Sequence, residues 1–270
     1  MQILPPPALA HIVRHFLIIE KDQIAHVNLR MFSDGNTGMV FNFGDPLMTY
    51  EHDSKISKIL PPSFIYGQLD TFQTIISVGK IQMLIVVFHP FGISSLLKIS
   101  AVEIRNEILD METFYASASQ TLNDQIFNSS TIFSKIRTVE NFLISKLSEN
   151  HNQDQLTFQA INLIHQQNGN LLVSQLISTL QVSERKLQRT FEEHIGLSPK
   201  RYSGVTRVQY FLKLLRKNPT ISQTKLVYDA GFFDQAHLIR EMKNISGITP
   251  SQYMRQPNLL AANFLQIPQE

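Results

Sequence analysis

Apolar and polar residues in the first ninety positions follow the two-residue period of β-strands. Alternating or β-branched apolar runs occur in five segments: Val13–Ile19, Val27–Phe32, Thr37–Phe43, Thr71–Val78 and Ile81–Phe88. Only Gly79 and Lys80 separate the last two segments. A two-residue Gly-X connection is typical of a hairpin turn. The pattern therefore predicts that these two strands pair with each other, within a small antiparallel sheet or barrel.

Beyond Pro90 the apolar period becomes that of helices. Apolar residues recur every three or four positions at Ile132, Ile136, Val139, Leu143 and Leu147, which predicts one apolar stripe along a helix. Such a stripe either packs on the sheet or forms the interface of a homodimer. The pattern alone does not decide between these two interpretations.

A polar stretch near the middle divides the chain. Residues 148–155 contain no apolar side chain, and we place a linker at 151–156. The expected domains are therefore 1–150 and 157–256, followed by a tail at 257–270. The fold class is α+β, with a β-barrel-like N-terminal domain that also carries helices and an all-α C-terminal domain.

The C-terminal part contains an internal repeat. Residues 196–202 and 247–253 both read Gly, apolar, Ser or Thr, Pro, any two residues, Tyr, and they lie 51 positions apart. Glycine adopts the left-handed conformation that closes a helix. Ser198 and Thr249 then cap the next helix, with a proline at its first position.

A helix-turn-helix pattern precedes each repeat motif. The first unit comprises helices at 172–180 and 184–195, and the second comprises helices at 222–230 and 235–245. The segment Pro199–Lys217 joins them as a helix about 28 Å long. Successive major-groove segments on one face of DNA lie about 34 Å apart. One helix of this length can therefore hold two reading helices in adjacent grooves.

The second helix of the first unit has two distinct faces. Leu187 and Phe191 lie on one face, whereas Arg185, Gln188 and Arg189 share the other. Arginine hydrogen-bonds guanine, and glutamine hydrogen-bonds adenine, at the major-groove edges of the bases. These three residues are therefore candidates for reading base sequence.

Composition and charge narrow the classes of function. The 270 residues contain no cysteine, which excludes disulfides, thiolate nucleophiles and cysteine-based metal sites. Residues 1–154 carry a net charge of −4, from 11 Lys and Arg against 15 Asp and Glu, whereas residues 155–255 carry +7, from 13 against 6. This asymmetry favours a polyanion partner for the C-terminal domain. With no signal-peptide pattern and no membrane-spanning apolar run, we expect a cytoplasmic protein without membrane association.

The C-terminal half resembles the AraC family of bacterial transcription regulators. The resemblance is carried by residues 181–191, 196–202, 231–240 and 247–253, in the order and spacing of the family. It implies two helix-turn-helix units that bind double-stranded promoter DNA, with RNA polymerase as a further partner. Position by position, it implies base-reading roles for Arg185, Gln188, Arg189, Gln235, Ala236, His237, Ile239 and Arg240.

Further cations are candidates for phosphate contacts: Lys186, Lys200, Arg201, Arg207, Lys213 and Lys243. Arg207 stands where the family usually has an arginine, either near the DNA backbone or in a structural ion pair. Three residues depart from the family pattern: Gln181 replaces a glycine, Gly204 interrupts the joining helix, and Phe211 replaces a small residue. Because Ala236 and Ile239 cannot hydrogen-bond, we expect the first unit to carry most of the direct base readout.

The N-terminal half resembles the cupin-like sensor and dimerisation domains of the same family, on the strength of residues 32–35, 40–46 and 88–92. Its aromatic residues either fill the barrel or line a pocket for a small-molecule effector. His11 and His15 are four positions apart, but no third ligand completes a metal site, and we expect neither a metal nor a cofactor. A regulator that needs no ligand and a cupin-type enzyme are the alternative functions.

Overall fold

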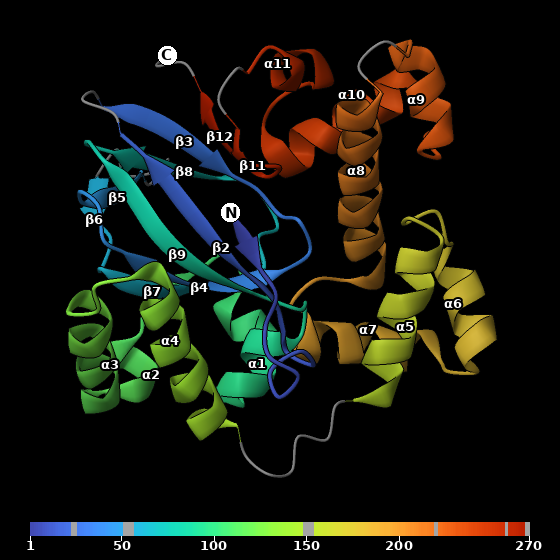
Figure 1. Ribbon diagram of the computed structural model, residues 1–270. Helices are drawn as coiled ribbons and strands as arrows, with labels where there is room; N and C mark the ends of the chain where they lie inside the picture. Colours follow the sequence, from blue (N-terminus) through green and yellow to red (C-terminus); the bar gives the residue numbers. More distant parts are fainter. Residues whose placement is uncertain (23–25, 51–56, 148–153, 219–220, 257–258, 268–270) are drawn as a thin grey trace.

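The computed structural model describes residues 1–22, 26–50, 57–147, 154–218, 221–256 and 259–267. The N-terminal domain is built from two six-stranded antiparallel sheets that face each other, and the C-terminal domain is all helical (Figure 1). The α+β class and its order of domains are therefore confirmed. Half of the expected linker, 151–153, lies outside the described residues, and a helix already begins at Gln155 in the other half.

The first sheet has the strand order β1 (Gln2–Ile3), β2 (Val13–Lys21), β9 (Ile81–Phe88), β4 (Thr37–Asn42), β7 (Ser63–Tyr66) and β10 (Ile108–Asp110). The second has the order β11 (Leu259–Ala261), β12 (Phe264–Ile267), β3 (Val27–Met31), β8 (Gln73–Ser77), β5 (Leu47–Tyr50) and β6 (Ser57–Ile59). β4 and β9 are apolar along most of their length because both of their faces are buried. Val40 and Ile85 point into the barrel, whereas Met39 and Leu84 point outward beneath helices.

Short helices cover the outer face of the first sheet: α1 (Gly92–Leu97), the 3₁₀ helix η1 (Ala101–Ile104), α2 (Glu112–Tyr115), α3 (Ser117–Phe127) and α4 (Ile132–Lys146). The predicted stripe lies on α4, where Ile136, Val139 and Leu143 are buried in the same cluster as Met39 and Leu84. Ile132 and Leu147 pack at its edge. The stripe therefore packs on the chain's own sheet. Its assignment to a dimer interface is corrected, because Ile136, Val139 and Leu143 have no free surface for a partner.

The predicted hairpin between β8 and β9 is wrong. β8 pairs with β3 and β5, and β9 pairs with β2 and β4, so the two strands belong to different sheets. Gly79 does not adopt the positive φ that a two-residue hairpin turn of this kind requires. Instead, the amide of Lys80 donates to Asp45 Oδ2 at 2.6 Å and its carbonyl accepts from the Asp45 amide at 2.8 Å. These contacts turn the chain from one sheet into the other.

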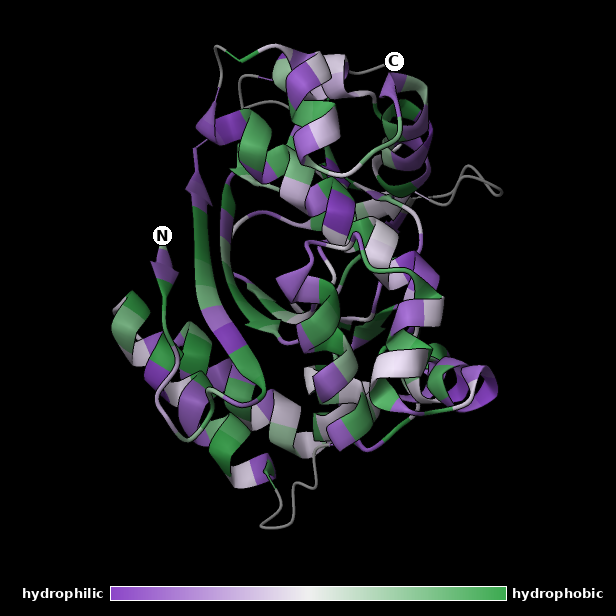
Figure 2. Cartoon of the chain, turned by 90° about the vertical axis from the view of Figure 1, so that its right-hand side faces the viewer, coloured by the Kyte–Doolittle hydropathy of each residue, from purple (hydrophilic) through white to green (hydrophobic). Residues whose placement is uncertain are grey.

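The C-terminal domain consists of α5 (Gln155–Gln166), α6 (Val173–Leu180), α7 (Glu184–His194), α8 (Pro199–Lys217), α9 (Gln223–Asp229), α10 (Gln235–Ser246) and α11 (Pro250–Met254). The predicted helices are confirmed, and α8 has the predicted bounds. The predicted caps Ser198 and Thr249 each accept a backbone hydrogen bond from the residue three positions on. Ser183 and Asp234 do the same at the starts of α7 and α10. Figure 2 shows hydrophilic and hydrophobic residues alternating along these helices, whereas the long strands are mostly hydrophobic.

The three departures from the family pattern have structural explanations. Gln181 takes the left-handed conformation at φ 52°, as the glycine it replaces would. A Cβ on Gly204 would lie 2.5 Å from Glu241 Oε1, so glycine leaves room for the Glu241 carboxylate beside α8. Phe211 is fully buried and packs edge-on against Phe232, with ring centroids 6.4 Å apart.

The expected tail contains two strands that the sequence did not predict. β12 pairs antiparallel with β3, with Phe264 opposite Met31 and Ile267 opposite Asn28. Phe264 enters the core of the barrel, whereas Leu265 and Ile267 belong to the core cluster of the helical domain. One strand from the end of the chain therefore connects the two hydrophobic cores (Figure 1).

We expect replacement of Phe264 by alanine to lower the free energy of unfolding by about 3 kcal/mol, because it removes a buried aromatic side chain. Chemical denaturation of the full chain measures this change. Phe233→Ala is the matched control, since Phe233 is 82% exposed and its loss should change stability by less than about 0.5 kcal/mol. Equal stability of the two variants would contradict the packing of β12.

Candidate nucleic-acid interface and cavity

The reading face of α7 is exposed and unpaired. Leu187 and Phe191 are fully buried in the helical core, which turns Arg185 and Arg189 to solvent and leaves Gln188 half exposed. Within the described part of the chain, none of these three polar side chains has a hydrogen-bond or ion-pair partner. The predicted cluster therefore comes together on one surface, where its donors are free for a ligand.

The equivalent face of α10 is chemically different. Leu238 and Met242 are buried, while Ala236, Ile239 and Arg240 are exposed. The helix therefore presents the three predicted residues on its outer surface, but only Arg240 among them carries a hydrogen-bonding side chain.

Two further residues predicted to read bases from α10 are engaged within the protein. The Gln235 side-chain amide donates to Thr224 Oγ1 at 2.9 Å. The His237 ring packs edge-on against Phe232 at 5.4 Å and lies 3.8 Å from a Glu241 carboxylate oxygen. Both side chains therefore have partners within the protein, and their base-reading roles stay predictions.

Four of the predicted phosphate-contacting cations are exposed to solvent: Lys186, Lys200, Lys213 and Lys243. Arg207 is paired instead, with its Nη2 atom 3.4 Å from Glu241 Oε1 and its guanidinium 5.3 Å from the centre of the Phe232 ring. The structural ion pair is therefore the interpretation that the structure supports. Since both partners are largely buried, Arg207 holds α10 on α8 and does not present a charge to solvent.

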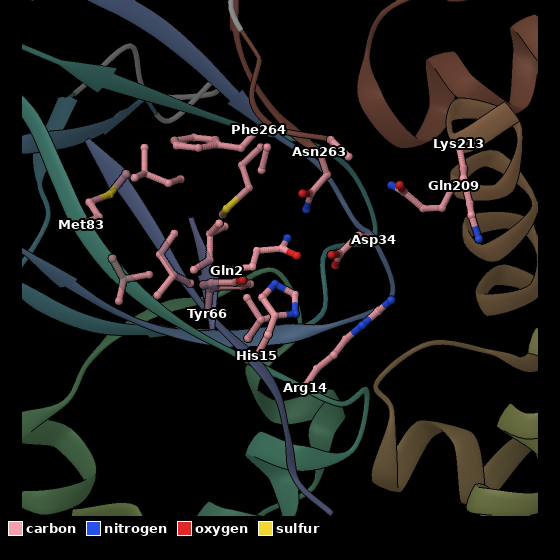
Figure 3. Close-up of a pocket in the computed structure, with 18 of the residues that line it drawn as sticks. Gln2, Arg14, His15, Asp34, Tyr66, Met83, Gln209, Lys213, Asn263 and Phe264 are labelled. Atoms are coloured by element: carbon pink, nitrogen blue, oxygen red, sulfur yellow. The ribbon is translucent and has the colours of Figure 1, made fainter. Parts of the chain in front are cut away.

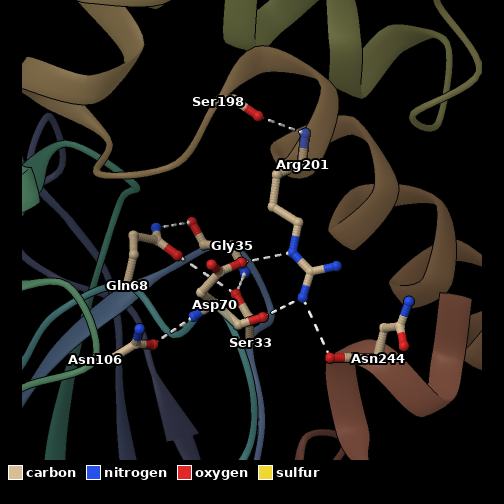
Figure 4. A network of polar contacts seen from close by, with 8 residues as sticks. All are labelled: Ser33, Gly35, Gln68, Asp70, Asn106, Ser198, Arg201 and Asn244. Carbon is tan, nitrogen blue, oxygen red and sulfur yellow. Dashed lines mark hydrogen bonds and ion pairs between the residues drawn. The ribbon is translucent and has the colours of Figure 1, made fainter.

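Arg201 joins the two domains (Figure 4). Its Nε atom lies 2.8 Å from Asp70 Oδ1, and Nη2 donates to the Asp70 carbonyl and, at 3.2 Å, to the Asn244 carbonyl. The Asp70 amide donates to Asn106 Oδ1 at 2.7 Å, which fixes the acceptor loop. The assignment of Arg201 to a phosphate contact is corrected, because its donors already serve the barrel and α10.

A cavity of 810 Å³ opens between the barrel and the helical domain. Its walls are apolar and come from both sheets, as Val40, Phe64, Ile85 and Phe264 illustrate. Its mouth is polar, and Gln209 and Lys213 of α8 face Asp34 and Arg14 across it (Figure 3). A cavity with apolar walls and a few converging polar groups is the usual form of a small-molecule site.

The mouth is predominantly cationic. Four cations line it, namely Arg14, Lys213, Arg216 and Lys217, together with the acidic Asp34. Burial lowers the pKa of His165 to about 4, and Arg14 and His89 act in the same direction. His165 is therefore neutral at pH 7, and its Nε2 atom shares a hydrogen bond of 2.8 Å with the buried Tyr202 hydroxyl.

The sequence analysis did not predict that these residues meet at the mouth of the cavity. Arg14, Asp34 and Lys213 are distant along the chain, and no spacing rule relates a strand residue to a helix two hundred positions away. Across the ranges that the structure describes, no three His, Cys, Asp or Glu side chains gather as metal ligands. No helix in those ranges is long and apolar enough to cross a membrane.

Comparisons with known proteins agree with this architecture. Residues 176–256 match the family described as "Helix-turn-helix domain", and residues 1–110 match a "Domain of unknown function (DUF6597)". An uncharacterized HTH-type transcriptional regulator of Haemophilus influenzae is 28% identical over 99 residues, which are 37% of this chain and 33% of that protein. The chain thus aligns with about a third of the length of this curated relative.

Solved structures of ToxT from Vibrio cholerae share the fold. One superposes with a TM-score of 0.50 at 12% identity, covering 88% of this chain and 97% of ToxT. Another, bound to (E)-4-(8-methylnaphthalen-1-yl)but-3-enoic acid, gives 0.50 at 13% identity with the same coverage. The match over residues 176–256 agrees with the resemblance of the C-terminal half to the AraC-type helix-turn-helix regulators, which are DNA-binding transcription regulators. In this chain the helix-turn-helix domain follows a DUF6597 domain.

Proposed function

We propose that this chain regulates transcription by binding a specific DNA sequence through α7 and α10. The observation that carries the proposal is the free face of Arg185, Gln188 and Arg189 on α7. Burying three unpaired polar side chains in a protein contact would be costly, whereas base edges in the major groove satisfy their donors. The net charge of +7 on residues 155–255 supports a polyanion as the ligand. Contact with RNA polymerase belongs to the same proposal.

Selection of bound sites from random duplexes tests this function. We expect a site with two recognition elements about 10 base pairs apart, one for each reading helix. Affinity should fall as salt rises, with a log–log slope of about −0.9 for each phosphate neutralised. Recovery of no preferred sequence would overturn the proposal.

Arg189→Ala should relax the sequence preference at one position under α7, at a cost of about 1–3 kcal/mol in binding free energy. Arg240→Ala should weaken binding with a smaller change of preference, because its neighbours on α10 do not hydrogen-bond bases. Site selection repeated with each variant measures both effects. Arg105→Ala, an exposed arginine outside the helical domain, is the control and should bind as the unmodified chain does. Equal relaxation by Arg189→Ala and Arg240→Ala would contradict the asymmetry.

We further propose that the cavity senses a small molecule. Support comes from its apolar walls, its cationic mouth and its position between the two domains. These features suit an apolar ligand with an anionic head group, and one of the similar ToxT structures holds a naphthyl butenoic acid. The cavity favours sensing over the alternative of a regulator that needs no ligand.

A thermal-shift comparison of dodecanoic acid with dodecanol tests sensing. The acid should raise the melting temperature by several degrees, because a ligand at one hundred times its Kd stabilises the folded state by about 2.7 kcal/mol. Arg14→Gln should reduce the shift, whereas Lys186→Gln, outside the cavity, should not. Equal shifts with the acid and the alcohol would exclude a role for the cationic mouth.

A homodimer contact on α4 must use residues other than the buried stripe. Phe133 is 66% exposed and Ile144 43% exposed, and their separation of eleven residues places them on one face of α4. We propose this face as the homodimer contact, because it exposes two large apolar side chains that the chain's own sheet does not cover.

Light scattering of the full chain should therefore give twice the 30.9 kDa of one chain. The double variant Phe133→Glu, Ile144→Glu should give a single chain mass, because it places charges in the contact. A single-chain mass for the unmodified protein would reject this interface.

A further inference from the structure

The exposed surface of α10 is apolar where that of α7 is polar. Ala236 and Ile239 are three residues apart on α10 and share one side of it, and Phe233 stands in the turn immediately before the N-cap residue Asp234. All three are exposed, Phe233 to 82% and Ile239 to 39%. Arg240 and Lys243 continue the same side toward the end of the helix. The surface is therefore an apolar row that ends in two cations.

The 51-residue offset of the repeat shows which residue of the first unit corresponds to each residue of this row. Ala236 corresponds to Arg185 and Ile239 to Gln188, so two hydrogen-bonding side chains of α7 become apolar ones in α10. Phe233 corresponds to Val182, which is half buried against the helical core. Phe233 instead points away from the core, and no described residue covers it.

The polar side chains next to this row do not replace the hydrogen-bonding groups that α10 lacks. Gln235 is held by Thr224, and His237 lies between Phe232 and Glu241. The Asp234 side chain accepts from the His237 amide at 2.7 Å, and this cap fixes the first turn of α10 immediately after Phe233. The exposed Phe233 is thus attached to a well-defined helix start.

We propose that α10 recognises thymine, through contact of Phe233, Ala236 and Ile239 with the C5-methyl groups in the major groove. Thymine is the only base that presents a methyl group there, so an apolar row distinguishes it without hydrogen bonds. Arg240 and Lys243 contact phosphates beside the row. The complete site then joins an element read by hydrogen bonds under α7 to a thymine-rich element under α10. This inference rests on the proposed DNA binding and adds the base class that the second helix reads.

Charge favours DNA over a protein as the occupant of this surface. The row ends in Arg240 and Lys243, and the repeat gives α10 the same position in its unit that α7 has in the first. A protein partner for such a row would need an acidic rim, whereas the DNA backbone supplies phosphates at a fixed distance from the methyl groups.

Replacement of thymine by 2′-deoxyuridine tests the inference, because it removes the methyl group and retains every hydrogen-bonding group. Each thymine of the selected site is replaced in turn, and Kd is measured by fluorescence anisotropy with the full chain. We expect about a fourfold loss of affinity for each contacted methyl group. The thymines whose replacement weakens binding should cluster in the recognition element under α10. They should not lie in the element under α7, where Arg189→Ala relaxes the sequence preference.

Phe233→Ala and Ile239→Ala should each lose the preference for thymine over deoxyuridine at the position that the replaced side chain contacts, and should keep it at the others. Phe158→Ala is the matched control, since Phe158 is an exposed phenylalanine on α5, and it should keep the full discrimination.

If the chain selects a site but deoxyuridine leaves Kd unchanged, the thymine inference fails while DNA binding stands. If no site is selected, the proposed function itself fails. If Phe233→Ala keeps the methyl discrimination but loses transcription activation, the surface belongs to a protein partner.

Discussion

The arrangement of the two domains depends on one strand pairing. β12 comes from the end of the chain, after the helical domain, yet it forms part of a barrel sheet by pairing with β3. Because successive side chains of a strand point to opposite faces, Phe264 fills the barrel core while Leu265 and Ile267 pack in the helical core. Separating the domains therefore requires breaking a hydrogen-bonded ladder and exposing apolar side chains on both faces of the strand.

The cavity lies where this strand, the barrel and α8 meet. Asn263 and Phe264 line it from the strand, and Gln209 and Lys213 line it from α8. Gln209 also donates to the Ser33 carbonyl at 2.9 Å, so a residue that lines the cavity also makes a contact between the domains. The helix that separates the two reading helices is therefore the same helix that any occupant of the cavity would touch. Gln209 and Lys213 of α8 therefore line the cavity on the same helix that sets the placement of the two reading helices.

The sequence predicted the helical domain better than the barrel. Helix bounds followed from caps, glycines and prolines that act within a few residues, as Gly196 does at the end of α7 and Ser198 at the start of α8. Strand partners depend on contacts between distant segments, and the amide of Lys80 bound to Asp45 overrode the hairpin pattern. The stripe on α4 was recognised as apolar, but periodicity could not tell which surface would cover it. Nothing local in residues 259–267 indicates that β3 is their partner, and Phe233 was missed because exposure is a property of the fold.

The ion pair at the centre of the helical domain holds the two helix-turn-helix units together as one body. Gly204 lets Glu241 approach α8, Arg207 neutralises that carboxylate, and Phe232 lies over the guanidinium. Breaking a buried pair leaves an uncompensated charge, so rotation of α10 away from α8 would be costly. At the other end of α8, Phe191 of α7 packs against Tyr202 with ring centroids 6.1 Å apart. Each reading helix is thus fixed to α8 by its own buried contact, and their separation is set by the length of that helix and not by the DNA.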